Sequence, residues 1–191
     1  MTKMREQVPM WLMLGVWLVS VSGAAAQSGS ETFTATASVK TAGGASASAP
    51  VTITVDRKMP AAEAETLVKA FVSGGTAALR KALVGVAPTG AITIGAGAAT
   101  PIRIAIERAT GDGRLLTLVT DKPLLFLGGG MPNAKPKEGY DYAVIDLQLD
   151  ATGGGSGVMA PAAKVKPLQG VFVVEDYGAE MVNLKDVRKT K

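Results

Sequence analysis

The chain of 191 residues contains no cysteine and no histidine, and aromatic residues make up only 5% of it. Without cysteine there can be no disulfide and no thiolate metal site. Without histidine the chain alone cannot supply a Ser-His-Asp or Cys-His hydrolase, a histidine-ligated zinc centre or a histidine proton shuttle. Carboxylates are therefore the main candidates for any acid–base chemistry.

The net charge is weakly positive, at +4, and the two signs are mixed along the sequence. This distribution does not predict the basic patch of a nucleic-acid-binding protein. The last residues include Lys185, Arg188, Lys189 and Lys191, with no aromatic residue for stacking on bases. We expect a basic tail over 185–191 that is solvated or meets an anionic surface, and no nucleic-acid partner.

The first residues have the layout of a secretory signal peptide. Lys3 and Arg5 precede an apolar segment over 11–21, which is followed by the small residues 24–26. The apolar segment is too short for a membrane anchor, because a spanning helix needs about 20 such residues. We expect cleavage after Ala26 and export of the remaining chain to the periplasm or the medium.

The mature chain has the length of a single domain. We expect residues 1–26 to be removed, 27–30 to be disordered, and 31–191 to form one domain. No stable membrane span is predicted once the leader is lost.

The segment from Pro60 to Gly85 carries the only clear helical signal. Its apolar residues recur at helical spacing, namely Ala64, Leu67, Val68, Phe71 and Val72. Gly74 and Gly75 interrupt this pattern, and Thr76 can cap a second helix that buries Leu79 and Leu83. The sequence therefore predicts two short helices, about 60–73 and 76–84.

Most of the remaining chain alternates between apolar and polar residues, which indicates half-buried strands. The predicted strands are 31–39, 51–55, 91–94, 102–108, 114–120, 140–150, 158–166, 171–175 and a short one near 181–184. The expected fold class is α+β: a single domain with a mainly antiparallel sheet and the two short helices packed on one face.

Residues 95–99, with the sequence GAGAA, follow a predicted strand and invite a dinucleotide-binding interpretation. That fingerprint requires its glycines to open a helix. Here Thr100 replaces the third glycine, and Pro101 begins another alternating strand with Ile102, Ile104 and Ile106 on one face. A hairpin connection is predicted instead, and no cofactor is expected.

Residues 128–139, with the sequence GGGMPNAKPKEG, form a long stretch without periodicity. It is either a mobile surface connection or a binding loop, since long irregular loops often carry contacts. The candidate partner-binding residues combine apolar and basic side chains that suit an anionic or amphipathic partner: Phe126, Leu127, Met131, Lys135 and Lys137.

The densest acidic set consists of Asp141, Asp146, Asp150, Glu175 and Asp176. A glycosidase would need two of these carboxylates about 5 to 10 Å apart, one with a raised pKa. Exposure on the solvent face of strands is the more common role of aspartate. The spacing does not match a calcium loop. We therefore predict no catalytic residue and no metal site.

The chain resembles a group of small, exported, uncharacterised bacterial proteins with no assigned activity. The resemblance lies in the runs DGRLLTLVTDKPLLFLGGGMPNAKPKEGYDYAVIDLQLD (112–150), APAAKVKPLQGVFVVEDYGAEMVNLKDVRK (160–189) and GGTAALRKAL (74–83). It implies export and a single domain, and it implies no activity.

Three functional hypotheses follow from the sequence. The first is a non-catalytic envelope or periplasmic protein that binds a ligand or a protein partner. The alternative is a hydrolase that uses carboxylates. The third is a protein that attaches to an anionic envelope surface through residues 185–191.

Overall fold

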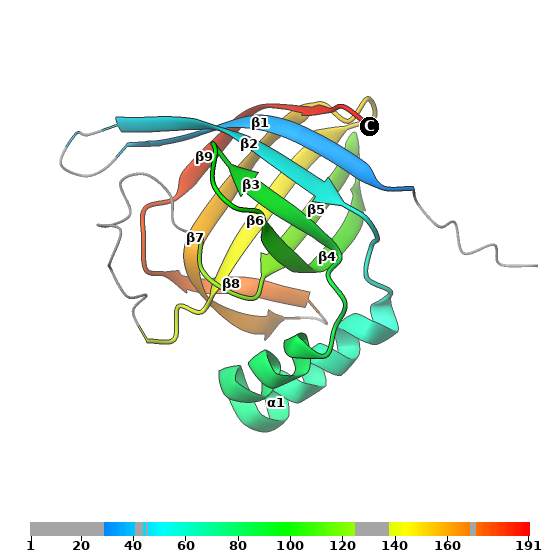
Figure 1. Ribbon diagram of the computed structural model, residues 1–191. Coiled ribbons are helices and arrows are strands. Elements are labelled where there is room, and N and C mark those ends of the chain that lie inside the picture. Colours follow the sequence, from blue (N-terminus) through cyan, green and yellow to red (C-terminus); the bar gives the residue numbers. More distant parts are fainter. Residues whose placement is uncertain (1–28, 41–43, 45, 125–137, 169–170) are drawn as a thin grey trace, which may run out of the picture.

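The computed structural model describes residues 29–40, 44, 46–124, 138–168 and 171–191 (Figure 1). Within them the chain forms one helix and nine strands. Their bounds are β1 Glu31–Lys40, β2 Ser46–Val55, α1 Ala61–Val84, β3 Gly90–Ile94, β4 Thr100–Thr110, β5 Gly113–Thr120, β6 Tyr142–Asp150, β7 Gly155–Leu168, β8 Val171–Tyr177 and β9 Val182–Lys189. No helix in this described part is both long and apolar enough to cross a membrane.

The sheet closes on itself. Its strands follow the order β6-β5-β4-β3-β2-β1-β9-β7, and β6 also pairs with β7, so that eight antiparallel strands form a barrel (Figure 1). β8 lies outside the barrel and pairs with β7. The predicted α+β class is therefore wrong: alternating residues describe one apolar face equally well in an open sheet and in a barrel wall, and only the closing pairs distinguish them.

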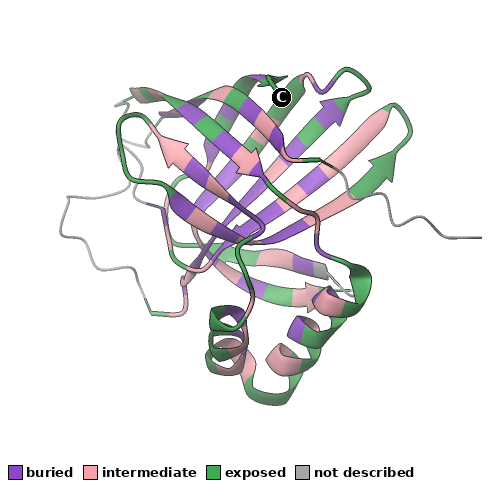
Figure 2. Ribbon diagram, turned by 45° about the vertical axis from the view of Figure 1, so that its right-hand side comes forward, coloured by how far each residue is buried: buried purple, intermediate pink, exposed green. Residues whose placement is uncertain are grey.

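Buried residues recur along the strands of the barrel (Figure 2), and their apolar side chains form one interior core. A barrel of eight strands is narrow enough for side chains to fill its interior. The largest fully buried members include Phe33, Ile53, Ile92, Leu116 and Leu118. Because each of the eight barrel strands contributes inward residues, this core holds together segments that are far apart in the sequence.

A second apolar core lies outside the barrel, where α1 and the β7–β8 hairpin cover the wall. Leu67 and Leu79 of α1 are buried against a cluster that includes Ile104 and Tyr142. The ring of Phe71 meets that of Phe172 edge to face, with centroids 6.1 Å apart. The helical region thus packs on the convex wall of a barrel, not on the face of an open sheet.

α1 is a single element that leaves helical conformation at the two predicted glycines. The backbone φ/ψ angles are −150°/18° at Gly74 and 64°/−155° at Gly75, and the second is a conformation that glycine adopts readily. Leu79 and Leu83 are buried as expected. Val72 is 72% exposed, so its predicted place on the buried face is wrong.

β-Bulges in β4 and β9 change which side chains point into the barrel. The register between β4 and β5 shifts between Ile102 and Ile104. Ile102 consequently belongs to the interior core, while Ile104 packs in the outer core. The predicted common face of Ile102, Ile104 and Ile106 is wrong, because a bulge reverses the alternation of a strand.

The second bulge lies in β9, around Asp186, which has a φ of 52°. Before it, Val182 and Leu184 face the interior; after it, Val187 does. The basic residues near the end of the sequence are part of this strand, which continues to Lys189 between β1 and β7. The predicted basic tail over 185–191 is thus largely a barrel strand.

The connection between β3 and β4 is a turn, in which the Gly97 N–H donates to the Ile94 carbonyl at 3.0 Å. β3 and β4 pair in antiparallel register on either side of it. The hairpin predicted in place of a dinucleotide-binding motif is confirmed.

Candidate functional site

Residues 128–137 of the predicted partner-binding loop lie outside the described residues, as do all five of its candidate residues: Phe126, Leu127, Met131, Lys135 and Lys137. Their role stays a prediction.

The five carboxylates of the densest acidic set lie in different local structures. Asp141 forms an ion pair with Arg80 of α1. Asp150 accepts hydrogen bonds from the hydroxyl and the N–H of Thr152, at 2.6 and 2.7 Å, which lower the pKa of its carboxyl. It thereby holds the turn between β6 and β7.

Asp176 and Glu175 lie near the end of β8. The hydroxyl of Tyr140 donates to the Asp176 carboxylate at 2.5 Å, and Glu175 is exposed. Of the five carboxylates, Asp150 lines an open depression beside the β6–β7 turn, and Asp146 lines a pocket on the outer wall of the barrel.

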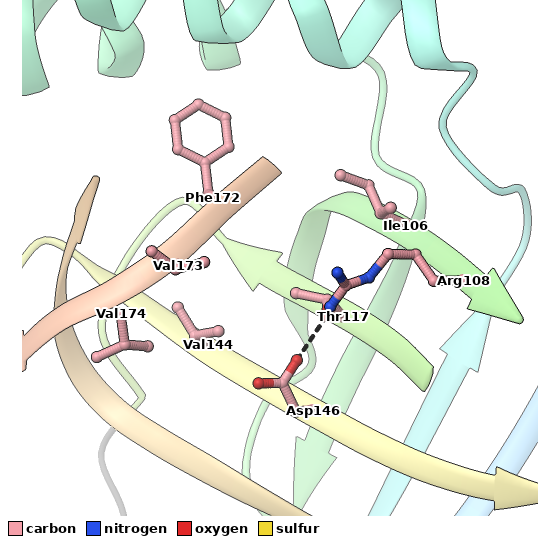
Figure 3. A pocket seen from close by; sticks show the side chains of 8 residues that line it. All are labelled: Ile106, Arg108, Thr117, Val144, Asp146, Phe172, Val173 and Val174. Atoms are coloured by element: carbon pink, nitrogen blue, oxygen red, sulfur yellow. Dashed lines mark hydrogen bonds between the residues drawn. The ribbon is translucent and has the colours of Figure 1, made fainter. Parts of the chain in front are cut away.

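This site is a pocket of about 130 Å³ between β8 and the outer wall of the barrel (Figure 3). The pocket is mainly apolar, with a polar group at three of its eight lining positions. Its lining residues are Ile106, Arg108, Thr117, Val144, Asp146, Phe172, Val173 and Val174.

The barrel wall of the pocket is built by residues of three adjacent strands. Ile106 of β4 lies opposite Thr117 of β5, which lies opposite Asp146 of β6. The Thr117 hydroxyl donates to the Asp146 carboxylate at 2.5 Å (Figure 3). Val144 lies two residues from Asp146 on the same face, as strand geometry requires. The pocket floor is therefore a row of side chains fixed by strand pairing.

Arg108 gives the pocket a cationic side. Its side chain is exposed, and none of the ion pairs among the described residues includes it. The carboxylate of Asp146, by contrast, is engaged with Thr117. Arg108 is thus the charge in this pocket that has no ion-pair partner among the residues that the structure describes.

A cluster of five charged residues occupies one end of the barrel: Glu31, Lys58, Glu107, Arg114 and Lys189. The Arg114 guanidinium donates to Glu31 at 2.8 Å and to Glu107 at 2.6 Å. Lys189 contacts Glu31 at 2.7 Å, and Lys58 lies 2.6 Å from Glu107 and 3.4 Å from Glu31. These contacts join the first strand to the last, and close the interior core at this end.

Glu31 is the centre of this cluster, with a side chain only 7% exposed. Burial alone would raise the pKa of its carboxyl. Hydrogen bonds from Arg114 and Lys189, with the charges of Arg114 and Lys58, outweigh burial and lower the pKa to about 2. Arg114 also lies over the ring of Phe33, 6.0 Å from its centroid. Glu31 is therefore ionised across the physiological range.

An open depression of about 540 Å³ lies beside the cluster, between the β4–β5 and β6–β7 turns. The cations that face it are already paired with Glu31 and Glu107, so it offers an incoming anion no uncompensated charge. The paired charges beside this depression therefore fit a structural role in closing the end of the barrel better than a role in binding a ligand.

Sequence reasoning missed the cluster, although part of the signal was present. Arg114 shares its parity with Leu116 and Leu118, and Glu31 shares its parity with Phe33, so both charges fall on apolar faces. The positions of Glu107 and Lys189 depend on the two bulges, which carry no such signal.

No group of three or more carboxylates that could hold a metal ion occurs among the described residues. No protein-family model, curated protein or solved structure matches this chain.

Proposed function

We propose that this chain is an exported, non-catalytic binding protein whose pocket beside β8 receives one apolar group of a larger partner. The observation that carries the proposal is the pocket itself: a small apolar hollow on the outer wall, bounded by Arg108 on its polar side (Figure 3). Anchor pockets of this kind contribute much of the affinity of protein–protein contacts.

The size of the pocket favours an anchor group over a complete small molecule. Sites for drug-sized ligands have volumes of about 300 to 1,000 Å³. A protein cavity of about 150 Å³ holds a single benzene ring. At about 130 Å³ this pocket matches one aliphatic or small aromatic side chain.

The arrangement of carboxylates gives little support to the alternative hydrolase. The pocket contains one carboxylate, Asp146, whereas the glycosidase mechanism needs two. The two carboxylates that do share cations, Glu31 and Glu107, lie in the ion cluster, where the pKa of Glu31 is lowered to about 2. A general acid needs the opposite shift.

Export is the part of the proposal that rests on the first 26 residues and on the resemblance to small exported proteins. It is tested by the intact mass of the protein recovered from an expressing bacterium. The mass of a chain beginning at Gln27 is expected, and a chain that retains Met1 would contradict it.

The binding site is tested with the N-acetyl methylamides of leucine, valine and phenylalanine as probes, observed by NMR on methyl-labelled protein. We expect saturable shifts of the methyl signals of Ile106, Val144 and Val174. The variant Ile106→Trp should lose them, because the indole fills the pocket. Val158→Trp is the control, since Val158 is 40% exposed on the same wall but outside the pocket.

If none of these probes shifts the pocket methyls, or if the shifts persist in Ile106→Trp, the pocket is not an anchor site. Hydrolysis of nitrophenyl glycosides by the purified protein, lost in Asp146→Asn, would favour the hydrolase instead.

A further inference from the structure

We propose that the anchor group belongs to an extended, acidic polypeptide segment that adds as a strand to the free edge of β8. This inference rests on the proposed function, because it names the partner of the same pocket. It adds a binding mode, strand addition, and a chemical class of partner, an acidic peptide. Either addition can be wrong while the pocket still binds a single side chain.

The lining of the pocket shows that it meets β8 along an edge. Phe172, Val173 and Val174 are consecutive, and all three line it (Figure 3). A strand directs successive side chains to opposite faces, so a cavity on one face would contact only alternate residues. Contact with three in a row places the cavity beside the backbone. The paired residues of β7, Val165 and Lys166 among them, do not line it.

The edge that faces the pocket has no strand beside it within the described part of the chain. β8 ends the strand order and pairs with β7 alone. Outside that pairing, none of the backbone hydrogen bonds found among the described residues joins residues 171–175 to another segment. In an antiparallel pair, every second residue directs its N–H and C=O away from its neighbour. β8 therefore presents backbone donors and acceptors toward the pocket.

Unpaired strand edges bind extended peptides in many recognition domains, where backbone hydrogen bonds supply affinity and side-chain pockets supply specificity. Here the two parts lie together: the edge of β8 supplies the hydrogen bonds, and the hollow formed with Ile106 and Val144 takes one apolar side chain.

The position of the edge determines what can reach it. It faces the chain's own barrel wall, formed by β4, β5 and β6, across the pocket. A second copy would have to bring its β8 edge into this space together with its own barrel wall. A single extended segment brings one strand to the edge and no barrel wall of its own, and its strand would lie about 4.8 Å from β8. The geometry therefore favours a peptide over pairing between two copies.

The positive charge of Arg108 favours an acidic composition for the bound peptide. Arg108 lines the pocket and has no ion-pair partner in the described chain, whereas Asp146 accepts a hydrogen bond from Thr117. In a strand, residues two apart lie on one face. An acidic residue two positions from the anchor would lie on the side of the pocket where Arg108 can pair with it.

The test uses the acetylated, amidated peptide Thr-Glu-Thr-Leu-Thr-Glu-Thr. Its leucine is the anchor, and one glutamate lies two positions before the leucine and another two positions after it. Calorimetry should show binding at least tenfold tighter than that of N-acetyl-leucine methylamide, because several backbone hydrogen bonds are added. NMR should show contacts between the peptide Hα atoms and those of β8.

Backbone methylation separates strand addition from simple side-chain docking. We expect N-methylation of the leucine and of the next threonine to have unequal effects, since only alternate amides face β8. One of the two peptides should lose at least tenfold in affinity, and the other should lose less than threefold. Equal effects would overturn strand addition, while retained binding of the single amino-acid probe would leave the proposed function intact.

The acidic preference is tested by a double-mutant cycle between Arg108→Gln and a peptide with glutamine in place of both glutamates. Arg108→Gln should weaken the acidic peptide about fivefold and the neutral peptide less than twofold. Equal weakening would overturn the acidic assignment. A concentration-dependent dimer that excludes the acidic peptide would show that a second copy occupies the edge, and would overturn the proposal.

Discussion

Glu31 is the residue whose replacement tests the structure most directly. Its carboxylate accepts from Arg114 and Lys189 and lies near Lys58, so one buried anion holds three cations from different parts of the chain. Replacing it in Glu31→Gln keeps the shape of the side chain and removes the charge. Arg114 and Lys58 would then keep Glu107 as a partner, whereas Lys189 would lose the carboxylate it pairs with in the cluster.

The expected magnitude follows from the pKa. The folded state lowers the pKa of Glu31 from 4.5 to about 2, and one pKa unit corresponds to about 1.4 kcal/mol. The ionised carboxylate therefore stabilises the fold by about 3 kcal/mol. Because the folded-state pKa lies below the ordinary one, this contribution is complete above pH 4.5 and disappears as the pH falls toward 2.

The assay is urea unfolding of the wild type and Glu31→Gln at pH 7 and at pH 2.5. At pH 7 the variant should be less stable by about 2 to 3 kcal/mol, since the amide retains part of the hydrogen bonding. The difference should shrink to about 1 kcal/mol or less at pH 2.5, because that pH lies close to the folded-state pKa of about 2. Glu65→Gln is the matched control on the exposed surface of α1, and should change stability by less than about 0.5 kcal/mol at either pH.

Two results would refute this reasoning. A Glu31→Gln variant as stable as the Glu65→Gln control at pH 7 would mean that the cluster does not close the barrel end. A difference that is the same at both pH values would mean that the loss comes from packing rather than from the charge.

Three further predictions concern the folded barrel, each measured as a change in the free energy of unfolding. Leu79→Ala should cost about 2 to 4 kcal/mol, because Leu79 is 1% exposed on the buried face of α1, whereas Val72→Ala, at an exposed position of the same helix, should cost less than about 0.5 kcal/mol; equal costs would contradict the packing of α1. Gly113→Ala should cost about 3 kcal/mol or more, because the new Cβ would lie 2.0 Å from a backbone carbonyl oxygen of β6, and Gly111→Ala in the same turn meets nothing within 4 Å and should be tolerated; a tolerated Gly113→Ala would show that the strands are not this close. Asp186→Val should cost about 1 to 2 kcal/mol, because a β-branched residue is strained at a φ of 52°, while Asp186→Gly should stay within about 0.5 kcal/mol of wild type; two equal variants would argue against the bulge.

Local features of the fold could be predicted from the sequence, and its closure could not. The alternation of apolar and polar residues over 31–39 and 114–120 identified β1 and β5. This alternation depends only on the geometry of the strand itself, and not on which strands it pairs with. Gly74 and Gly75 marked the break in α1 for the same reason. Closure requires β6 to pair with β7 and β1 with β9. These pairings leave no mark on the alternation itself, so the open sheet was predicted wrongly.

The candidate site was harder to predict because it combines residues from four strands. Phe172 and Ile106 each looked like ordinary strand residues, and their approach depends on where β8 lies relative to the barrel. Arg108 looked like one of many exposed cations. What distinguishes it is the absence of an ion-pair partner in the described chain together with its place at an apolar pocket, which only the structure brings together.

One strand, β7, connects the two cores and accounts for the position of the pocket. Its first half pairs with β6 and β9 in the barrel wall, and its second half pairs with β8 outside the wall. Since β7 leaves the barrel while still a strand, β8 is held near the outer wall by continuous pairing rather than by a loose loop. Phe172 of β8 then packs on Phe71 of α1, which fixes the outer side of the hairpin. The free edge of β8 is thus kept open by the same contacts that build the outer core.

Phe71→Ala should therefore weaken binding of the acidic peptide as well as the packing of α1. Calorimetry at a temperature where the variant remains folded would measure the loss of affinity. Unchanged affinity in that variant would show that the edge is positioned by β7 alone.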